Sequence, residues 1–133
     1  MLDLSSQTLF GIGIDLVENQ RIAGLIERYD QRFLHRIFTE KERRYCLRKR
    51  RSIEGFAARF AAKEAFLKAI GTGLRMGTRW RDIGVVNNSA GKPLLEISGP
   101  TEELLRQKHI AHLELSLTHS DQYAAAIVVA LKA

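Results

Sequence analysis

The longest apolar stretch of the chain predicts one long helix over residues 56–70. The stretch has no Pro and no interior Gly, and residues that favour helices fill it. At about 100° per residue, its phenylalanines lie on one broad face and its alanines on the other. A helix that is apolar on nearly all sides is normally covered by other elements. We expect Ser52 to cap its start and Gly71 to end it in a left-handed conformation.

Alternating and amphipathic patterns predict shorter elements on either side. Residues 9–17 predict a buried strand with Ile12, Ile14 and Leu16 on one face and Gly11, Gly13 and Asp15 on the other. Helices are expected at 19–29, around 31–37, for roughly ten residues after the capping box at 39–42, and up to Lys108 after residues 98–101. Strands are expected at 82–87, 93–97, 111–118 and 123–131, the last pair joined by a hairpin at 119–122.

The order of these elements predicts the fold class. Helices fill most of the first half of the chain and strands most of the second, which is typical of one α+β domain. We expect a single domain over residues 1–133, with a small antiparallel or mixed sheet packed on the long central helix. Residues 1–7 are expected to form a loose or edge segment, and residues 74–81 an exposed loop anchored by Trp80.

Two carboxylates do not fit their apolar elements, Asp15 on the first strand and Glu64 on the central helix. Aspartate is disfavoured inside strands, and a charge on a covered helix is costly without a partner. Asp15 is either a strand-end cap or a ligand. Glu64 either forms an i,i+4 ion pair with Lys68, worth about 0.3–0.5 kcal/mol, or belongs to a site. Mg²⁺ is usually held by one or two carboxylates with phosphate oxygens and water. Candidate phosphate neutralisers are Arg59, Lys63, Lys68 and His119.

Composition changes this picture by pointing to an anionic partner. The net charge is +6 and the isoelectric point is near 9.8, which favours a nucleic acid, a phosphorylated small molecule or an acidic protein. The basic run at 48–51 is either a solvated helix end or an anion-binding patch. Cys46 is the only cysteine, which excludes an intrachain disulfide and a multi-cysteine zinc site. We expect a cytoplasmic protein, because no apolar run approaches ~20 residues and no basic region opens the chain.

Four motifs are spread from Gly11 to Val129. They are Gly-Ile-Gly-Ile-Asp at 11–15, Arg-Phe-Ala-Ala-Lys-Glu-Ala-Phe-Leu-Lys-Ala at 59–69, Gly-Lys-Pro at 91–93, and the pair Ser-Leu-Thr-His at 116–119 with Tyr-Ala-Ala-Ala at 123–126. In this order they resemble the opening motif, the signature helix, a turn and the last strand pair of the small bacterial holo-[acyl-carrier-protein] synthases, which are 4′-phosphopantetheinyl transferases. The length fits the short type of transferase.

The resemblance implies the phosphopantetheinyl transferase fold and its Mg²⁺-dependent reaction, which supports fatty acid biosynthesis. The 4′-phosphopantetheine of coenzyme A would move to a serine of apo-acyl carrier protein, releasing adenosine 3′,5′-bisphosphate. Asp15 and Glu64 would hold the Mg²⁺, Lys68 would face the phosphates, and Glu64 or a water that it orients would take the serine proton. A homotrimer with sites between subunits is also implied. Implied coenzyme A contacts are Arg59, Lys68, Gly91, Pro93 and His119; implied carrier contacts are Arg21 and Arg28.

Two other functions fit parts of the sequence. A nucleic-acid-binding protein would explain the positive charge and the basic run, but the chain has no recognition motif and few aromatic residues for base stacking. A structural interaction domain would leave Glu64 and Lys68 as a plain ion pair. The resemblance favours the transferase, so we expect no nucleic-acid partner and no membrane partner.

Overall fold

The computed structural model describes residues 7–133, so the segment expected at 1–7 lies, except for Gln7, outside the described part. At the centre of the fold is helix α4 (Ser52–Ile70), whose alanines and phenylalanines are buried. The helix starts at Ser52, earlier than predicted, and Arg51 is the N-cap, so the expected Ser52 cap is wrong. It ends as predicted: Gly71 has a φ of 78°, which glycine adopts without strain.

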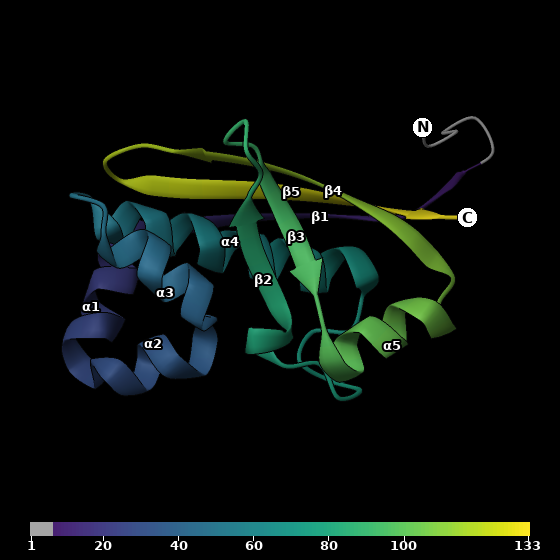
Figure 1. Cartoon of the computed structure of the whole chain (residues 1–133), viewed down its shortest axis with the longest axis horizontal. Coiled ribbons are helices and arrows are strands. Elements are labelled where there is room, and N and C mark those ends of the chain that lie inside the picture. The colour runs from purple at the N-terminus through teal and green to yellow at the C-terminus, as the bar shows by residue number, and fades with distance from the viewer. Residues whose placement is uncertain (1–6) are drawn as a thin grey trace.

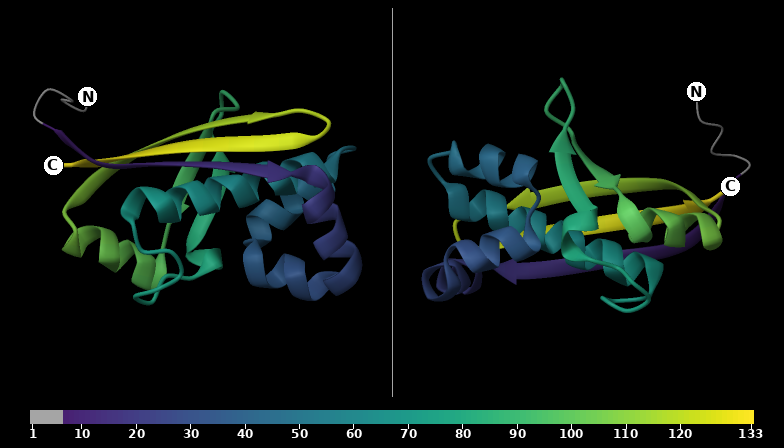
Figure 2. Two further views of the ribbon diagram at one scale, coloured as in Figure 1. Left: turned by 180° about the vertical axis from the view of Figure 1, so that it is seen from behind. Right: turned by 60° about the horizontal axis from the view of Figure 1, so that its bottom comes forward.

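Three antiparallel strands lie along α4 in the order β1–β5–β4 (Figures 1 and 2). They are β1 (Thr8–Glu18), β4 (Ile110–His119) and β5 (Tyr123–Lys132), and the last two form the expected hairpin. The alanines and the valine that β5 turns toward α4 are small and buried: Ala124, Ala126, Val128 and Ala130. Small residues on both surfaces allow the helix to lie close to the sheet.

Strand β1 alternates as predicted, but it is not buried on both faces, because its apolar face is exposed. Ile12, Ile14 and Leu16 are 54%, 64% and 65% exposed. The glycine face lies against α4 instead: a Cβ on Gly13 would be 1.8 Å from the carbonyl oxygen of Ala65. Because glycine has no side chain, the helix backbone packs directly on the strand, and this contact takes the place of apolar side chains.

The other elements flank this helix–sheet pair. Helices α1 (Asn19–Tyr29), α2 (Gln31–Ile37) and α3 (Glu40–Leu47) gather at one end, and α5 (Gly99–Gln107) lies at the other (Figure 1). Strands β2 (Ile83–Asn87) and β3 (Pro93–Ile97) form a second antiparallel sheet after a 3₁₀ turn at Trp80–Asp82.

The local signals in these flanking elements are confirmed. The capping box at the start of α3 has both of its hydrogen bonds, between Thr39 and Glu42, and Pro100 lies in the first turn of α5. Within residues 7–133, no helix combines the length and the apolar character needed to cross a membrane.

Candidate active site

The close contact of β1 with α4 brings Asp15 to Lys68. Side chains alternate along a strand, so Asp15 lies on the same face as Gly13 and points toward the helix. The Lys68 Nζ donates to Asp15 Oδ1 at 3.0 Å and to the carbonyl oxygen of Ile14 at 3.1 Å. Among the described residues, Lys68 therefore forms its ion pair with Asp15. It does not pair with Glu64, which lies one turn earlier on the same helix.

Glu64 lies half-buried beside this pair. Its burial, and then the negative charge of Asp15, raise the pKa of Glu64 above the ordinary glutamate value, while Lys68 and Arg21 partly oppose the shift. Two carboxylates that repel each other favour a bound cation. The donors are carboxylate oxygens from two rigid elements at a partly open position, and such donors suit Mg²⁺, which takes its remaining ligands from phosphate and water.

A groove of about 330 Å³ runs from Glu64 and Lys68 toward Trp80. Leu67, Leu74 and the backbone of Gly71 and Gly73 complete its lining.

Trp80, which lines this groove, and Arg21 both contact Phe60. The Trp80 ring stacks on Phe60 with centroids 5.3 Å apart, and the Arg21 guanidinium lies 5.6 Å from the centre of the Phe60 ring. Arg21, expected to contact the carrier, thus lies close to the carboxylate cluster. Arg28 does not: it is exposed in the last turn of α1, over the Tyr29 ring.

A second hollow, of about 400 Å³, contains the expected residues Arg59, Pro93 and His119. The Arg59 guanidinium lies 4.4 Å from the Tyr45 ring centre and donates to Asn87 Oδ1 at 2.9 Å. Its Nε is buried without a hydrogen-bond partner among the residues that the structure describes. The carbonyl of the expected Gly91 accepts from the Asn87 amide at 3.1 Å, so this turn adjoins the hollow.

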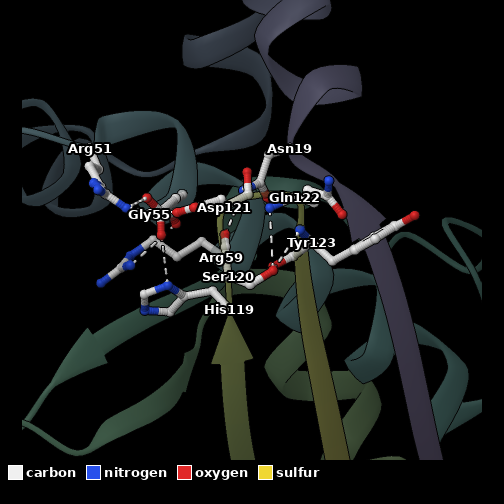
Figure 3. A network of polar contacts seen from close by, with 10 residues as sticks. Asn19, Arg51, Gly55, Arg59, His119, Ser120, Asp121, Gln122 and Tyr123 are labelled. Atoms are coloured by element: carbon white, nitrogen blue, oxygen red, sulfur yellow. Dashed lines mark hydrogen bonds and ion pairs between the residues drawn. The ribbon is translucent and has the colours of Figure 1, made fainter.

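The tip of the β4–β5 hairpin positions His119 in this hollow (Figure 3). His119 Nδ1 lies 3.0 Å from Glu54 Oε1, and Arg51 pairs with Glu54 at 3.2 Å and with Asp121 at 2.8 Å. The buried Asn19 donates to the carbonyls of Ser120 and Asp121, which fastens the hairpin to the start of α1.

The two hollows lie on different sides of α4. Arg59 and Glu64 are five positions apart, which places them about 140° from each other around the helix. The four residues of the basic run are all exposed: Lys49 and Arg51 line the second hollow, and Arg48 lines an adjoining hollow that shares Tyr45, Arg59 and Asn87 with it. Lys63 joins neither hollow; it is buried against Glu42.

Sequence reasoning missed Tyr45, Glu54 and Asn87 in the second hollow, and Trp80 in the first. Tyr45, Glu54 and Asn87 stand in segments with no motif of their own. Trp80 was expected only to anchor a loop. The single signal that could have drawn attention to it is that Trp80 is the only tryptophan of the chain.

Comparison with known proteins gives the class of the fold and site. Residues 11–128 match the model of the 4′-phosphopantetheinyl transferase superfamily. The chain is 49% identical to the holo-[acyl-carrier-protein] synthase of Syntrophotalea carbinolica over 121 residues, covering 91% of this chain and 94% of that protein. The crystal structure of the holo-[acyl-carrier-protein] synthase from Neisseria meningitidis superposes with a TM-score of 0.87 at 35% identity, covering 92% of this chain and 98% of the other.

A synthase from Bacillus anthracis, solved in complex with CoA (3′,5′-ADP), has a TM-score of 0.78 at 37% identity and covers 94% of this chain and 98% of its own. The chain belongs to the 4′-phosphopantetheinyl transferase superfamily. This confirms the family and the fold class predicted from the motifs.

Proposed function

We propose that this enzyme is a cytoplasmic transferase that moves 4′-phosphopantetheine from coenzyme A to a serine of an apo-acyl carrier protein in fatty acid biosynthesis. Adenosine 3′,5′-bisphosphate is the second product. The observation that carries the proposal is the Asp15–Glu64 carboxylate cluster with Lys68 beside it, in a chain whose relatives are named as synthases of this kind.

Asp15 and Glu64 are the residues that would hold Mg²⁺. An ion held there would supply positive charge to the pyrophosphate of coenzyme A. Lys68 adds a second positive charge, because its amine is partly exposed and can turn from Asp15 to a phosphate oxygen. Phosphoryl transfer depends mainly on positioning and on stabilising the spread of negative charge, which this arrangement provides.

Glu64 is also the candidate acceptor of the serine proton, directly or through a water that it orients. A base is most effective when its pKa lies near the working pH. Without the cation, burial and the charge of Asp15 raise the pKa of Glu64 in that direction. A bound Mg²⁺ would lower this pKa again, so in the loaded site Asp15 would act by sharing the cation.

The second hollow suits the nucleotide end of coenzyme A. Arg59 offers a buried cationic donor whose Nε has no partner among residues 7–133, and Tyr45 and Pro93 offer apolar surfaces. His119 and the turn at Gly91 complete this proposed contact set. The basic run retains its alternatives: Lys49 and Arg51 line this hollow and Arg48 the adjoining one, where they would meet a phosphate, whereas Arg50 lines neither.

We place the carrier protein on helix α1. Arg21 and Arg28 are both exposed on this helix, and an acidic partner would be attracted to them. Arg21 lies near Glu64, so a carrier bound there could present its serine to the carboxylates.

The exposed apolar face of β1 supports the proposed homotrimer. Ile12, Ile14 and Leu16 continue onto Ile127 of β5, which is 40% exposed and paired with Ile14. Apolar patches of this kind on a folded domain commonly mark protein interfaces. A neighbouring copy would bury them, and it could bring its own second hollow toward the Asp15–Glu64 cluster, so that one coenzyme A molecule spans two subunits.

Mass spectrometry of a purified apo-carrier tests the reaction. Incubation with the protein, coenzyme A and Mg²⁺ should add one phosphopantetheine group to the carrier. Asp15→Ala and Glu64→Ala should abolish the transfer while the circular dichroism spectrum stays native. Glu103→Ala, an exposed glutamate on α5, is the matched control and should behave as wild type. Near-normal turnover by either site variant in saturating Mg²⁺ would reject the assignment of the metal ligands.

A further inference from the structure

Lys63 and Glu42 form a fully buried ion pair that the proposed chemistry does not use. Both side chains are 0% exposed, and the Lys63 Nζ lies 2.7 Å from Glu42 Oε1. The same ammonium donates to the carbonyl oxygen of Trp80 at 3.2 Å and to that of Ile83. Its three protons thus meet three acceptors, and two of these are backbone atoms at the start of the β2 segment.

Glu42 is held as completely as its partner. Its Oε1 accepts from the Thr39 backbone N–H at 2.8 Å, and its Oε2 from the Val85 N–H at 3.0 Å. The pair therefore joins the first turn of α3, the middle of α4 and the segment from Trp80 to Val85. Replacing a buried ion pair by apolar residues of similar volume often preserves stability. Apolar side chains could not, however, donate to the two carbonyls.

The hydrogen bond from Lys63 to the Trp80 carbonyl holds a residue that lines the proposed site. Trp80 ends the exposed loop that follows α4, in which Met76 is 67% exposed and has a φ of 62°. Its ring lines the groove that contains Glu64 and Lys68. Lys63 directly precedes Glu64 on α4, so the residue that holds the Trp80 carbonyl is next to a carboxylate of the proposed site.

We propose that Lys63, together with Glu42, is a positioning pair that fixes Trp80 as the wall of the groove in which Glu64 and Lys68 act. The proposal rests on the proposed function where it concerns coenzyme A. The position of Trp80 itself can be measured without any substrate, because Trp80 is the only tryptophan and its fluorescence reports this site alone.

The test compares Lys63→Met, Glu42→Gln and the double variant. Each single variant leaves a buried charge without its partner and should lose stability. The double variant should recover much of that loss, because neither charge remains. It still lacks the donor for the Trp80 carbonyl, so acrylamide should quench Trp80 more strongly than in wild type. The double variant keeps Asp15, Glu64 and Lys68. Its kcat/KM should nevertheless fall about tenfold, mainly through a higher KM for coenzyme A.

The matched control is Lys41→Met with Glu96→Gln, which removes an exposed pair of the same residue types. It should leave the quenching of Trp80 unchanged. Trp80→Ala tests the wall without touching the pair, and should raise the KM for coenzyme A by a similar factor.

A folded double variant with wild-type quenching and wild-type KM would overturn the proposal, and so would a Trp80→Ala variant with unchanged KM. Should the wild-type protein transfer no phosphopantetheine, the proposed function would fail. The quenching of Trp80 would then decide by itself whether the pair fixes the wall.

Discussion

Replacing Gly13 by alanine is the most direct test of how β1 and α4 build the site. The added Cβ would lie 1.8 Å from the carbonyl oxygen of Ala65 and 2.7 Å from the backbone nitrogen of Ala69. Contacts under 3.0 Å are essentially never seen, so strand and helix must separate by about 1.2 Å. Both opposing atoms belong to the helix backbone, and no flexible side chain can move aside.

This separation has a cost in stability and a larger one in activity. Overpacking costs about 1–3 kcal/mol, and we expect the upper end, which lowers the melting temperature of a chain of this size by about 10 °C. Asp15, two positions along the strand, bonds to Lys68 at 3.0 Å and would move with it. A misplacement of about 1 Å can lower a rate by about a hundredfold. We therefore expect kcat/KM to fall by that factor in the folded variant.

Urea unfolding followed by circular dichroism gives the free energy, and transfer to the apo-carrier below the unfolding transition gives the rate. Gly24→Ala in α1 is the control for the unfolding measurement, since a Cβ there meets no atom within 4 Å. Because glycine weakens the interior of a helix, Gly24→Ala should raise the free energy of unfolding by about 0.5–1 kcal/mol. If Gly13→Ala unfolds at the same urea concentration as wild type and keeps most of its activity, the close helix–strand contact is not what positions Asp15.

Three further predictions follow from the same geometry. Carboxyl ¹³C NMR should find a raised pKa for Glu64, and Asp15→Asn should lower it because a repelling charge is lost. In the metal-free protein, ionising Glu64 then reduces folding stability as the pH rises through the raised pKa; an unmoved pKa in Asp15→Asn would contradict the coupling. If the proposed homotrimer uses the exposed face of β1, Ile14→Asp should give a monomer in light scattering with its circular dichroism unchanged, and an intact oligomer would exclude this face as the interface. Thr39→Ala removes one arm of the capping box and should cost about 1 kcal/mol in urea unfolding; no measurable loss would mean that the cap adds little there.

Elements with strong local signals could be predicted from the sequence. The long helix, its left-handed end at Gly71, the capping box at Thr39 and the last hairpin all depend on residues close to one another in the chain. The start of α4 was misplaced because Ser52, a residue type that favours the N-cap position, lies in the first turn, and Arg51 takes the N-cap position instead.

The expected burial of β1 holds for one face only, because alternation defines two faces without saying which one is covered. Gly11 and Gly13 allow a close approach on their face, and the element that approaches there is α4. The helix that packs on the strand presents alanine and backbone, and the complementary surface is one without side chains. The apolar side chains are left exposed for another surface.

The family, the carboxylate candidates and most of the elements could be predicted from the sequence, because they depend on residue type and short-range spacing. The pairings became visible only in the folded chain: Lys68 pairs with Asp15, 53 positions away, and Lys63 with Glu42, 21 positions away. A charged side chain takes its partner from whatever the fold brings within reach, and burial sets how strongly it needs one. The partner of each side chain and its burial depend on how α4 packs against β1 and α3. No pattern of neighbouring residues in the sequence predicts this packing.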